Sequence, residues 1–238
     1  MDSFLQSALN AMQQGRGSGL PAASGRIYDD LRQRILSLEL VPGTSLSRAE
    51  LAKHYDVSQT PLRDALQRLE QDSLIKIYPQ SKTLVTHIDH DRISQALFLR
   101  RALESEVCLM LATTTQPFLL AQLRAVIEAQ RSVSADTAKL RQFQELDEYF
   151  HFLMFDALGR SDLHSLMRSR TSDLDRVRRL QTHSSGQLDL ILQGHVEITD
   201  ALESGDATRA VTALRQHLEK PDDWVLTYQN RFPDYFAA

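Results

Sequence analysis

From residue 89 to the end of the chain, apolar residues recur at the spacing of helical turns, and no stretch shows the alternation of a β-strand. Short breaks such as Gly159 and Ser204-Gly205-Asp206 separate the periodic segments. The pattern predicts helices over residues 89–113, 117–134, 137–158, 161–183, 188–204 and 206–228. Amphipathic helices joined by short turns bury their apolar faces against one another. We therefore expect an all-helical antiparallel bundle over residues 89–238.

Residues 24–88 are organised differently. A first apolar stripe predicts a helix that stops at the sequence VPG, and Ser47 with Glu50 three residues later has the spacing of a capping box that starts a second helix. A third helix, within residues 56–70, carries Pro61 in its first turn. β-Prone residues then flank the turn sequence PQSK, which predicts a two-stranded hairpin. This order is that of a winged helix-turn-helix, so the expected fold is mostly α, with this domain in front of the bundle.

Composition adds weaker constraints. Residues 1–23 are rich in Gln, Gly, Ser and Ala, which predicts a flexible arm with a short helix around residues 3–13. The single cysteine, Cys108, the lack of an apolar run of ~18–20 residues, and the lack of a signal-type N-terminus indicate a cytoplasmic protein. Residues 24–88 hold nine Lys/Arg and eight Asp/Glu, while residues 89–238 hold seventeen and twenty-two. Charge alone therefore does not indicate a nucleic-acid partner.

The third short helix has its polar residues at its start. In a winged helix-turn-helix this helix enters the major groove and reads bases with its N-terminal residues. Ser58 and Thr60 can cap the helix or bond phosphate, Pro61 fixes the first turn, and Arg63 can reach a phosphate or a guanine edge. Lys82, at the hairpin tip, suits the neighbouring backbone or minor groove. Because Ser-x-Thr-Pro is also a common helix cap, the order of the surrounding elements is what favours DNA binding.

Three of the helices predicted in the back half place metal-ligand side chains on apolar faces. Asp147 and His151, at i and i+4, share the buried face of one helix, and His195 and His217 lie on the apolar stripes of two others. A single histidine in such a place is usually a hydrogen-bonded core residue, but an unpaired buried carboxylate is very costly. A divalent cation that bridges Asp147 to the three imidazoles would satisfy all four groups. The set suits zinc first, with nickel or manganese as alternatives.

The front domain resembles the DNA-binding domain of GntR-type bacterial transcription regulators over residues 27–88. The matching motifs are LRQRILSLELVPGTSLSRAELAKHYDVSQTPLRDALQRLEQDSLI and the wing YPQSKTLVTHI. This chain has Gln59 and Ala49 where the family often has Arg, and Ser81-Lys82 where a glycine is usual. Because Gln pairs best with adenine and Arg with guanine, the usual half-site is not expected. The resulting DNA-contact set is Arg48, Ser58, Gln59, Thr60, Pro61, Arg63, Arg68 and Lys82.

Residues 92–220 resemble FCD, the ligand-binding domain of the FadR branch of these regulators. The matching pieces are LFLRRALESEVCLMLA, DEYFHFLMF, GHVEITDAL and ALRQHL. The resemblance implies that a metal ion is held by Asp147, His151, His195 and His217. It also implies that Arg100 lines an effector pocket, the alternative being an i,i+4 pair with Glu104. His164 and His183 lie outside the motif and are expected to be ordinary polar residues.

These observations favour a transcription regulator that binds a palindromic double-stranded DNA operator as a homodimer and responds to a small carboxylate or sugar-acid effector. The main alternative is a metal-dependent enzyme that acts on a small carboxylic acid and is fused to a DNA-binding domain. Against it, Glu145 and Glu148 are expected to point away from Asp147, which leaves no general base. A domain used only for dimerisation would leave the buried Asp147 unexplained.

Overall fold

The computed structural model describes residues 22–79, 81–114, 117–180, 185–221 and 223–237. The predicted N-terminal helix around residues 3–13 and His183 lie outside these residues. The chain divides into two compact units. The helical unit is built on residues 97–167 and 182–220, and the front unit on residues 16–96, 168–181 and 221–238.

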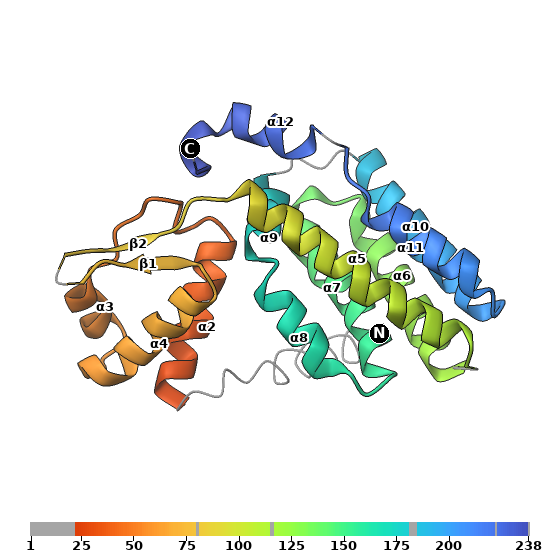
Figure 1. The fold of residues 1–238 in the computed structure, drawn as a ribbon, viewed down its shortest axis with the longest axis horizontal. Coiled ribbons are helices and arrows are strands. Elements are labelled where there is room, and N and C mark those ends of the chain that lie inside the picture. The colour runs from red at the N-terminus through yellow and green to blue at the C-terminus, as the bar shows by residue number, and fades with distance from the viewer. Residues whose placement is uncertain (1–21, 80, 115–116, 181–184, 222, 238) are drawn as a thin grey trace. The chain divides into compact units, whose positions relative to one another are not determined.

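The front unit contains three helices and a hairpin in the predicted order, followed by elements from later in the chain (Figure 1). Its elements are α2 (Ala22–Leu36), α3 (Arg48–His54), α4 (Gln59–Gln71), β1 (Ile75–Ile77), β2 (Thr83–Val85), α9 (Ser172–Leu180), α12 (Trp224–Arg231) and the short 3₁₀ turn η2 (Pro233–Tyr235). β1 and β2 pair antiparallel, with Ile75 opposite Val85 and Ile77 opposite Thr83. The winged helix-turn-helix prediction is thus confirmed.

Local sequence explains these short elements well. The Ser47 side chain caps α3 by accepting a hydrogen bond from the Glu50 N–H at 3.3 Å, as predicted. Leu62, Leu66 and Leu69 on α4 are completely or almost completely buried. They join the apolar stripe of α2 in one core cluster. Helical spacing thus turns the apolar face of α4 into the core and leaves its polar first turn on the surface.

Helix α9 packs into the front unit through a buried arginine. Arg176 is fully buried and donates a hydrogen bond to the Thr86 carbonyl at 2.6 Å, just beyond β2. Its guanidinium also pairs with Asp173, which in turn pairs with Arg92 at 2.8 Å. A buried guanidinium needs several acceptors, and the backbone that leaves the hairpin supplies one of them.

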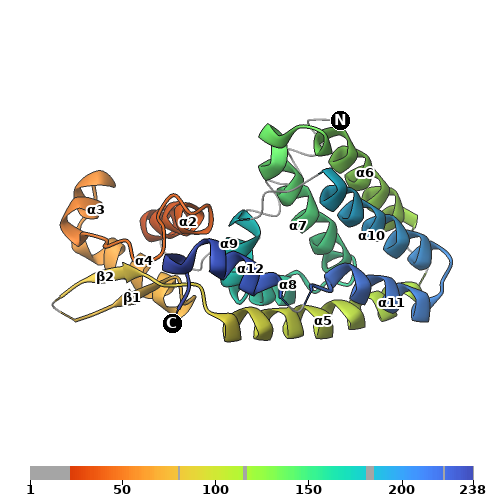
Figure 2. The same ribbon diagram turned by 90° about the horizontal axis from the view of Figure 1, so that it is seen from above.

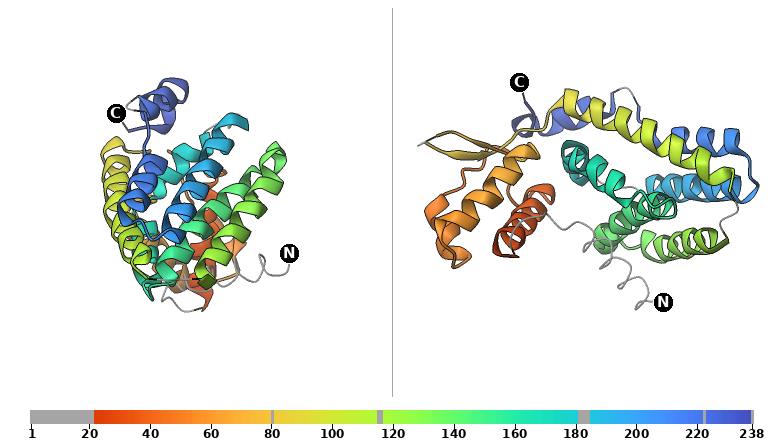
Figure 3. Two further views of the ribbon diagram at one scale, coloured as in Figure 1. Left: turned by 90° about the vertical axis from the view of Figure 1, so that its right-hand side faces the viewer. Right: turned by 60° about the horizontal axis from the view of Figure 1, so that its bottom comes forward.

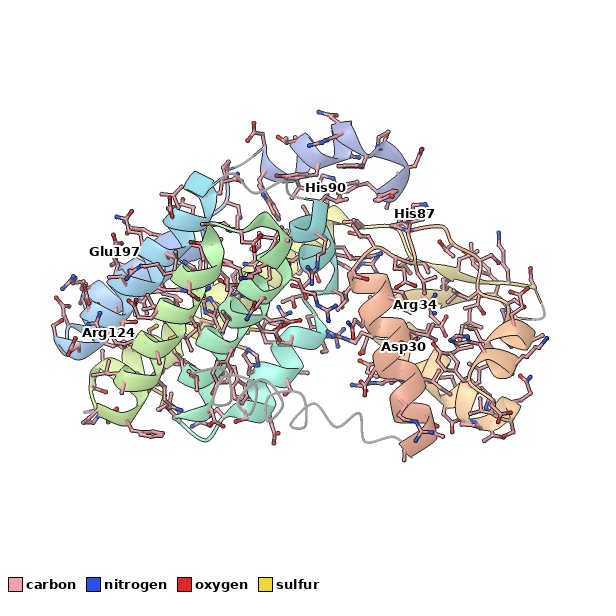
Figure 4. All side chains as sticks on the ribbon, turned by 180° about the vertical axis from the view of Figure 1, so that it is seen from behind. Asp30, Arg34, His87, His90, Arg124 and Glu197 are labelled. Atoms are coloured by element: carbon pink, nitrogen blue, oxygen red, sulfur yellow. The ribbon has the colours of Figure 1, made fainter. Side chains whose placement is uncertain are left out.

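The C-terminal segment pairs with the same connection by backbone hydrogen bonds. The Ile88 N–H donates to the Tyr235 carbonyl at 2.8 Å, and the Ala237 N–H donates to the Ile88 carbonyl at 2.8 Å. The Phe236 ring lies 5.7 Å from the imidazole of His90, which is labelled with His87 in Figure 4. The sequence predicts a domain boundary after residue 88, which puts residues 168–181 and 221–238 in the back domain. In the structure, the contacts of these two segments lie in the front unit.

The helical unit is a bundle of helices (Figures 2 and 3). Apolar side chains from several of these helices form its core. The helices that lie wholly or partly in this unit are α5 (His90–Ala112), α6 (Pro117–Ser134), α7 (Leu140–Asp156), α8 (Ser161–Ser169), α10 (Ser185–Glu203) and α11 (Ala207–Leu218). α6 packs against α7 and α10, and α10 against α11. Arg124 of α6, labelled in Figure 4, pairs with Asp200 of α10 at 2.7 Å.

Two segments that were each predicted as one helix are each divided into two helices in the structure. The segment 161–183 is divided at residues 170 and 171, where Thr171 precedes the new helix start formed by Ser172 and Asp173. The segment 206–228 ends its first helix at Leu218. Pro221 follows, and a proline disfavours a helical residue before it. The segment 137–158 begins with a 3₁₀ turn, η1 (Thr137–Lys139), and continues as α7.

No helix among the described residues combines the length and apolar character needed to cross a membrane. The mostly α fold class, with a two-stranded wing as its only sheet among those residues, matches the prediction.

Candidate functional site

The N-terminal end of α4 presents polar side chains to solvent. Ser58, Gln59, Thr60 and Arg63 are exposed, and Pro61 is half-buried in the first turn. Ser58 occupies the cap position, but its hydroxyl makes no capping hydrogen bond. The hydroxyl is therefore not committed to the helix and can bond a phosphate oxygen. The Arg63 guanidinium lies 3.8 Å from the Asp64 carboxylate, and the Arg63 side chain is two-thirds exposed. An ion pair with this spacing and exposure is weak.

The remaining residues of the predicted DNA-contact set lie elsewhere in the front unit. Arg48 is exposed at the start of α3, and Lys82 is exposed on the hairpin with its amine 5.5 Å from the centre of the Tyr78 ring. Arg68 lies in the last turn of α4, about 13 Å from the helix start at 1.5 Å per residue. Its guanidinium lies 3.8 Å from the Asp72 carboxylate. Arg68 thus pairs with Asp72 at the end of α4, and its contact with DNA stays a prediction.

The predicted metal ligands converge from three helices of the helical unit. Asp147 and His151 come from α7, His195 from α10 and His217 from α11. One ligand atom from each of the four lies within 4.8 Å of the others. The two Nε2 atoms of His151 and His217 are 3.2 Å apart, and His195 Nε2 is 3.4 Å from Asp147 Oδ1. The spacings of 3.2 and 3.4 Å are those of neighbouring ligands that each lie ~2.0–2.2 Å from a shared zinc ion.

Neighbouring oxygen atoms favour one tautomer in two of the rings. His195 Nδ1 is 2.8 Å from the Gln130 side-chain oxygen, and His151 Nδ1 is 2.7 Å from the Glu104 carboxylate. An oxygen acceptor at these distances favours the proton on Nδ1, which leaves the lone pair on Nε2. The lone pair of His195 Nε2 then faces the Asp147 Oδ1 atom at 3.4 Å with no hydrogen atom between them. A cation resolves this arrangement, so the residues present fit a divalent metal.

The electrostatics favour neutral imidazoles at His195 and His217. Burial lowers the pKa of His195, and burial together with the two neighbouring imidazoles lowers the pKa of His217 well below its ordinary value. Burial alone would raise the pKa of Glu104, but Arg100 and His151 outweigh it and hold the pKa of this carboxyl well below its usual range. Neutral imidazoles and ionised carboxylates are the protonation states that metal binding requires.

Comparison with known proteins identifies both parts of the chain. Residues 95–220 match the family model described as FCD domain, and residues 23–85 match the model described as bacterial regulatory proteins, gntR family. The chain belongs to the GntR family. An uncharacterized HTH-type transcriptional regulator in an unstable DNA locus of Streptomyces ambofaciens is 35% identical over 89% of each chain. The HTH-type transcriptional repressor RspR of Escherichia coli K12 is 28% identical over 89% of this chain and 92% of its own.

Solved structures of GntR-type proteins share the fold. Escherichia coli McbR/YncC superposes with a TM-score of 0.72 at 17% identity and covers 89% of this chain and all of its own. A GntR-type regulator from Rhodococcus sp. RHA1 has a TM-score of 0.68 at 22% identity, covering 87% and 98%. The family models and the named relatives make this GntR-family chain a transcriptional regulator, and they do not support the enzyme alternative.

Three residues of this GntR-family site were missed by sequence reasoning. Glu104 was considered only as a partner of Arg100, and its Oε1 indeed accepts from that arginine at 2.7 Å. Gln130 is fully buried on the apolar face of α6, and a glutamine on such a stripe was a visible signal. Gly194 packs against His217, where an added Cβ would lie 2.6 Å from Nδ1. No spacing rule reveals that contact.

Other predictions about the helical unit have mixed outcomes. His164 is buried between the rings of Phe152 and Phe155 and is not in the ligand cluster. Glu145 pairs with Arg141 at 2.9 Å on the exposed side of α7. The buried Arg100–Glu104 pair realises the alternative considered for Arg100, and an effector contact of this arginine stays a prediction.

Proposed function

We propose that this GntR-family regulator binds a palindromic operator as a homodimer and that a small anionic effector, held at a divalent cation, changes its operator affinity. The cation is zinc, or nickel or manganese where those are more available. The observation that carries the proposal is the convergence of three imidazoles and one carboxylate, with an oxygen of Glu104 and an oxygen of Gln130 beside Nδ1 of two of the rings. Residues 24–88 would bind DNA and residues 89–238 would bind the effector and the second protomer, in the cytoplasm.

The metal would be held by Asp147, His151, His195 and His217. When bound, it supplies a positive centre whose remaining coordination positions can accept oxygen atoms of a ligand. The protein side chains exclude water from the site by their burial, and they orient the atoms that bind the metal. Metal binding only to the native state also adds stability.

The buried charges favour an anionic effector. At the candidate site, Glu104 carries one negative charge and Arg100 one positive charge, and metal binding requires Asp147 to be ionised as well. A divalent cation changes the sum of these charges from minus one to plus one. An uncompensated buried charge is costly, so a monoanion such as a carboxylate is a favourable addition. Arg100 supports this role because its buried Nη1 has no hydrogen-bond partner among the described residues.

The front unit supports sequence-specific DNA binding. A single recognition helix reads few base pairs, and a two-fold symmetric dimer doubles them, which explains the proposed homodimer and the palindrome. Gln59 at the exposed start of α4 is suited to adenine, so we propose that the half-site contains an adenine at the position it contacts.

The proposal is tested in two steps. Selection from a random double-stranded oligonucleotide pool should give a palindromic consensus, and band-shift titration should give the operator affinity. A thermal-shift screen of metal-loaded protein with small carboxylic and sugar acids should then identify ligands that raise the melting temperature. Such a ligand should change operator affinity, and chelation should abolish the change. No palindrome, or an acid response that persists after complete chelation, would refute the corresponding half of the proposal.

A further inference from the structure

A chain of buried polar contacts runs from α5 to a predicted metal ligand. Arg100 Nε donates to Glu104 Oε1 at 2.7 Å, and Glu104 Oε2 lies 2.7 Å from His151 Nδ1. Glu104 is fully buried, and Arg100 and His151 are nearly so. One carboxylate oxygen therefore accepts a hydrogen bond from the arginine, and the other lies in ion-pair contact with the imidazole without the alignment of a hydrogen bond.

This geometry favours one tautomer of His151. An ionised carboxylate can only accept hydrogen bonds, so its position 2.7 Å from His151 Nδ1 favours the tautomer with the proton on that nitrogen. Without that acceptor, the proton could occupy Nε2, and the ring would present an N–H group to the metal position instead of a lone pair. The Arg100 guanidinium supports the arrangement because it lies 2.7 Å from the Glu104 carboxylate and is its buried counter-ion.

The tautomer of His195 is also favoured by a neighbouring side chain, but less strongly. Its Nδ1 faces Oε1 of Gln130, and both side chains are fully buried. An amide differs from a carboxylate because rotation by 180° exchanges its acceptor for a donor. The amide nitrogen of Gln130 has no hydrogen-bond partner among the described residues that would oppose this rotation. A neutral amide also adds less basicity to the ring than an anion does.

We propose that Glu104 and Gln130 are positioning residues of the metal centre, which act through His151 and His195, and that the charged Glu104 contributes more to metal affinity than Gln130. The inference rests on the metal-binding part of the proposed function. It also assigns Arg100 a role that needs no effector, as the counter-ion of Glu104.

The test is the zinc affinity of the full-length protein, measured by competition with a chromophoric chelator. Loss of an outer partner of a metal-bound histidine typically weakens metal binding ~10–100-fold. We expect Glu104→Gln to fall in this range and Gln130→Met to have a smaller effect. Glu145→Gln is the matched control, because this carboxylate lies on the exposed side of α7 and pairs with Arg141. A zinc affinity of Glu104→Gln within twofold of wild type would overturn the proposal.

Two further variants separate positioning from a loss of folding. Glu104→Gln leaves Arg100 buried without its counter-ion, so the double variant Arg100→Met/Glu104→Gln removes both charges and should still bind zinc weakly. In a His151→Ala background, Glu104→Gln should cause no additional loss, because its route to the metal is gone. Additive losses would contradict that route. If wild type takes up no metal, the proposed function fails; if it binds metal and Glu104→Gln binds equally well, only this inference fails.

Discussion

Replacement of Gly194 by alanine tests how closely α10 and α11 must approach to form the metal centre. The added Cβ would lie 2.6 Å from Nδ1 of His217 and 3.2 Å from its Cβ and Cγ. Contacts under 3.0 Å essentially never occur and ordinary contact begins at 3.4 Å, so Nδ1 of His217 and the added Cβ have to separate by a further 0.4–0.8 Å. Because the clash includes the Cβ of His217, rotation of the ring alone cannot relieve it. The movement is larger than the ±0.2 Å within which metal–ligand distances are held.

The expected result is that Gly194→Ala binds zinc as weakly as His217→Ala does. Its effect on stability is smaller: overpacking costs about 1–3 kcal/mol, partly offset by about 0.5–1 kcal/mol because alanine is a better helix former than glycine. The metal-free melting temperature should therefore change by only a few degrees, whereas the rise on adding zinc should be lost.

The assay is chelator competition for zinc beside thermal unfolding with and without the metal. Gly186→Ala is the matched control because Gly186 also lies in α10 and has nothing within 4 Å of an added Cβ. This control should bind zinc like wild type. Wild-type zinc affinity in Gly194→Ala would show that His217 is not a ligand or that the helices separate without cost, and would refute the reasoning.

Three further predictions concern DNA and pH. Arg63→Ala should weaken operator binding by ~1–3 kcal/mol if it reads a base, whereas Lys82→Ala should weaken binding to all sequences and reduce the salt slope by ~1; wild-type band shifts for both would contradict these contacts. Gln59→Arg should change the selected base at one position of each half-site toward guanine, and an unchanged consensus would mean that Gln59 touches no base. The pKa of His217 is lowered in the folded state, so the unfolded state binds more protons below the ordinary value of ~6.5. Metal-free protein should therefore lose stability to urea as the pH falls from 7.5 to 5.5, and the loss should be smaller in His217→Gln; equal losses would exclude this cause.

The winged helix-turn-helix was predictable because its signals are local. Ser47 caps the helix that its spacing to Glu50 indicated, and the apolar residues of α4 are those at helical spacing. The later segments were not predictable in the same way. The C-terminal residues pair with Ile88 through backbone groups, which carry no side-chain signature.

The break within residues 161–183 was missed because apolar spacing continues from α8 into α9. The sequence Thr171-Ser172-Asp173 is nevertheless a helix-start signal, and Asp173 is held by Arg176 and Arg92. Pro221 was a stronger and purely local signal for the end of α11. Periodicity therefore located the buried faces correctly and the helix ends less well.

The candidate ligands could be proposed from the sequence because Asp147 and His151 share a helical face and a buried carboxylate demands a partner. The residues that surround these ligands could not be proposed from the sequence. Gln130 lies 65 residues from His195, and no local pattern joins two such positions. The contact between Gly194 and His217 depends on how closely two helices pack, which only the three-dimensional structure provides.

The most direct test of the central claim is the metal content of the purified protein. Elemental analysis of wild type, after incubation with zinc, nickel or manganese and removal of excess ion, should find a single divalent cation per chain. His195→Ala and His217→Ala should lose it while the front unit still binds DNA, because their side chains lie in the helical unit. A wild-type protein that retains no metal under any of these conditions would contradict the account and return these histidines to an ordinary core.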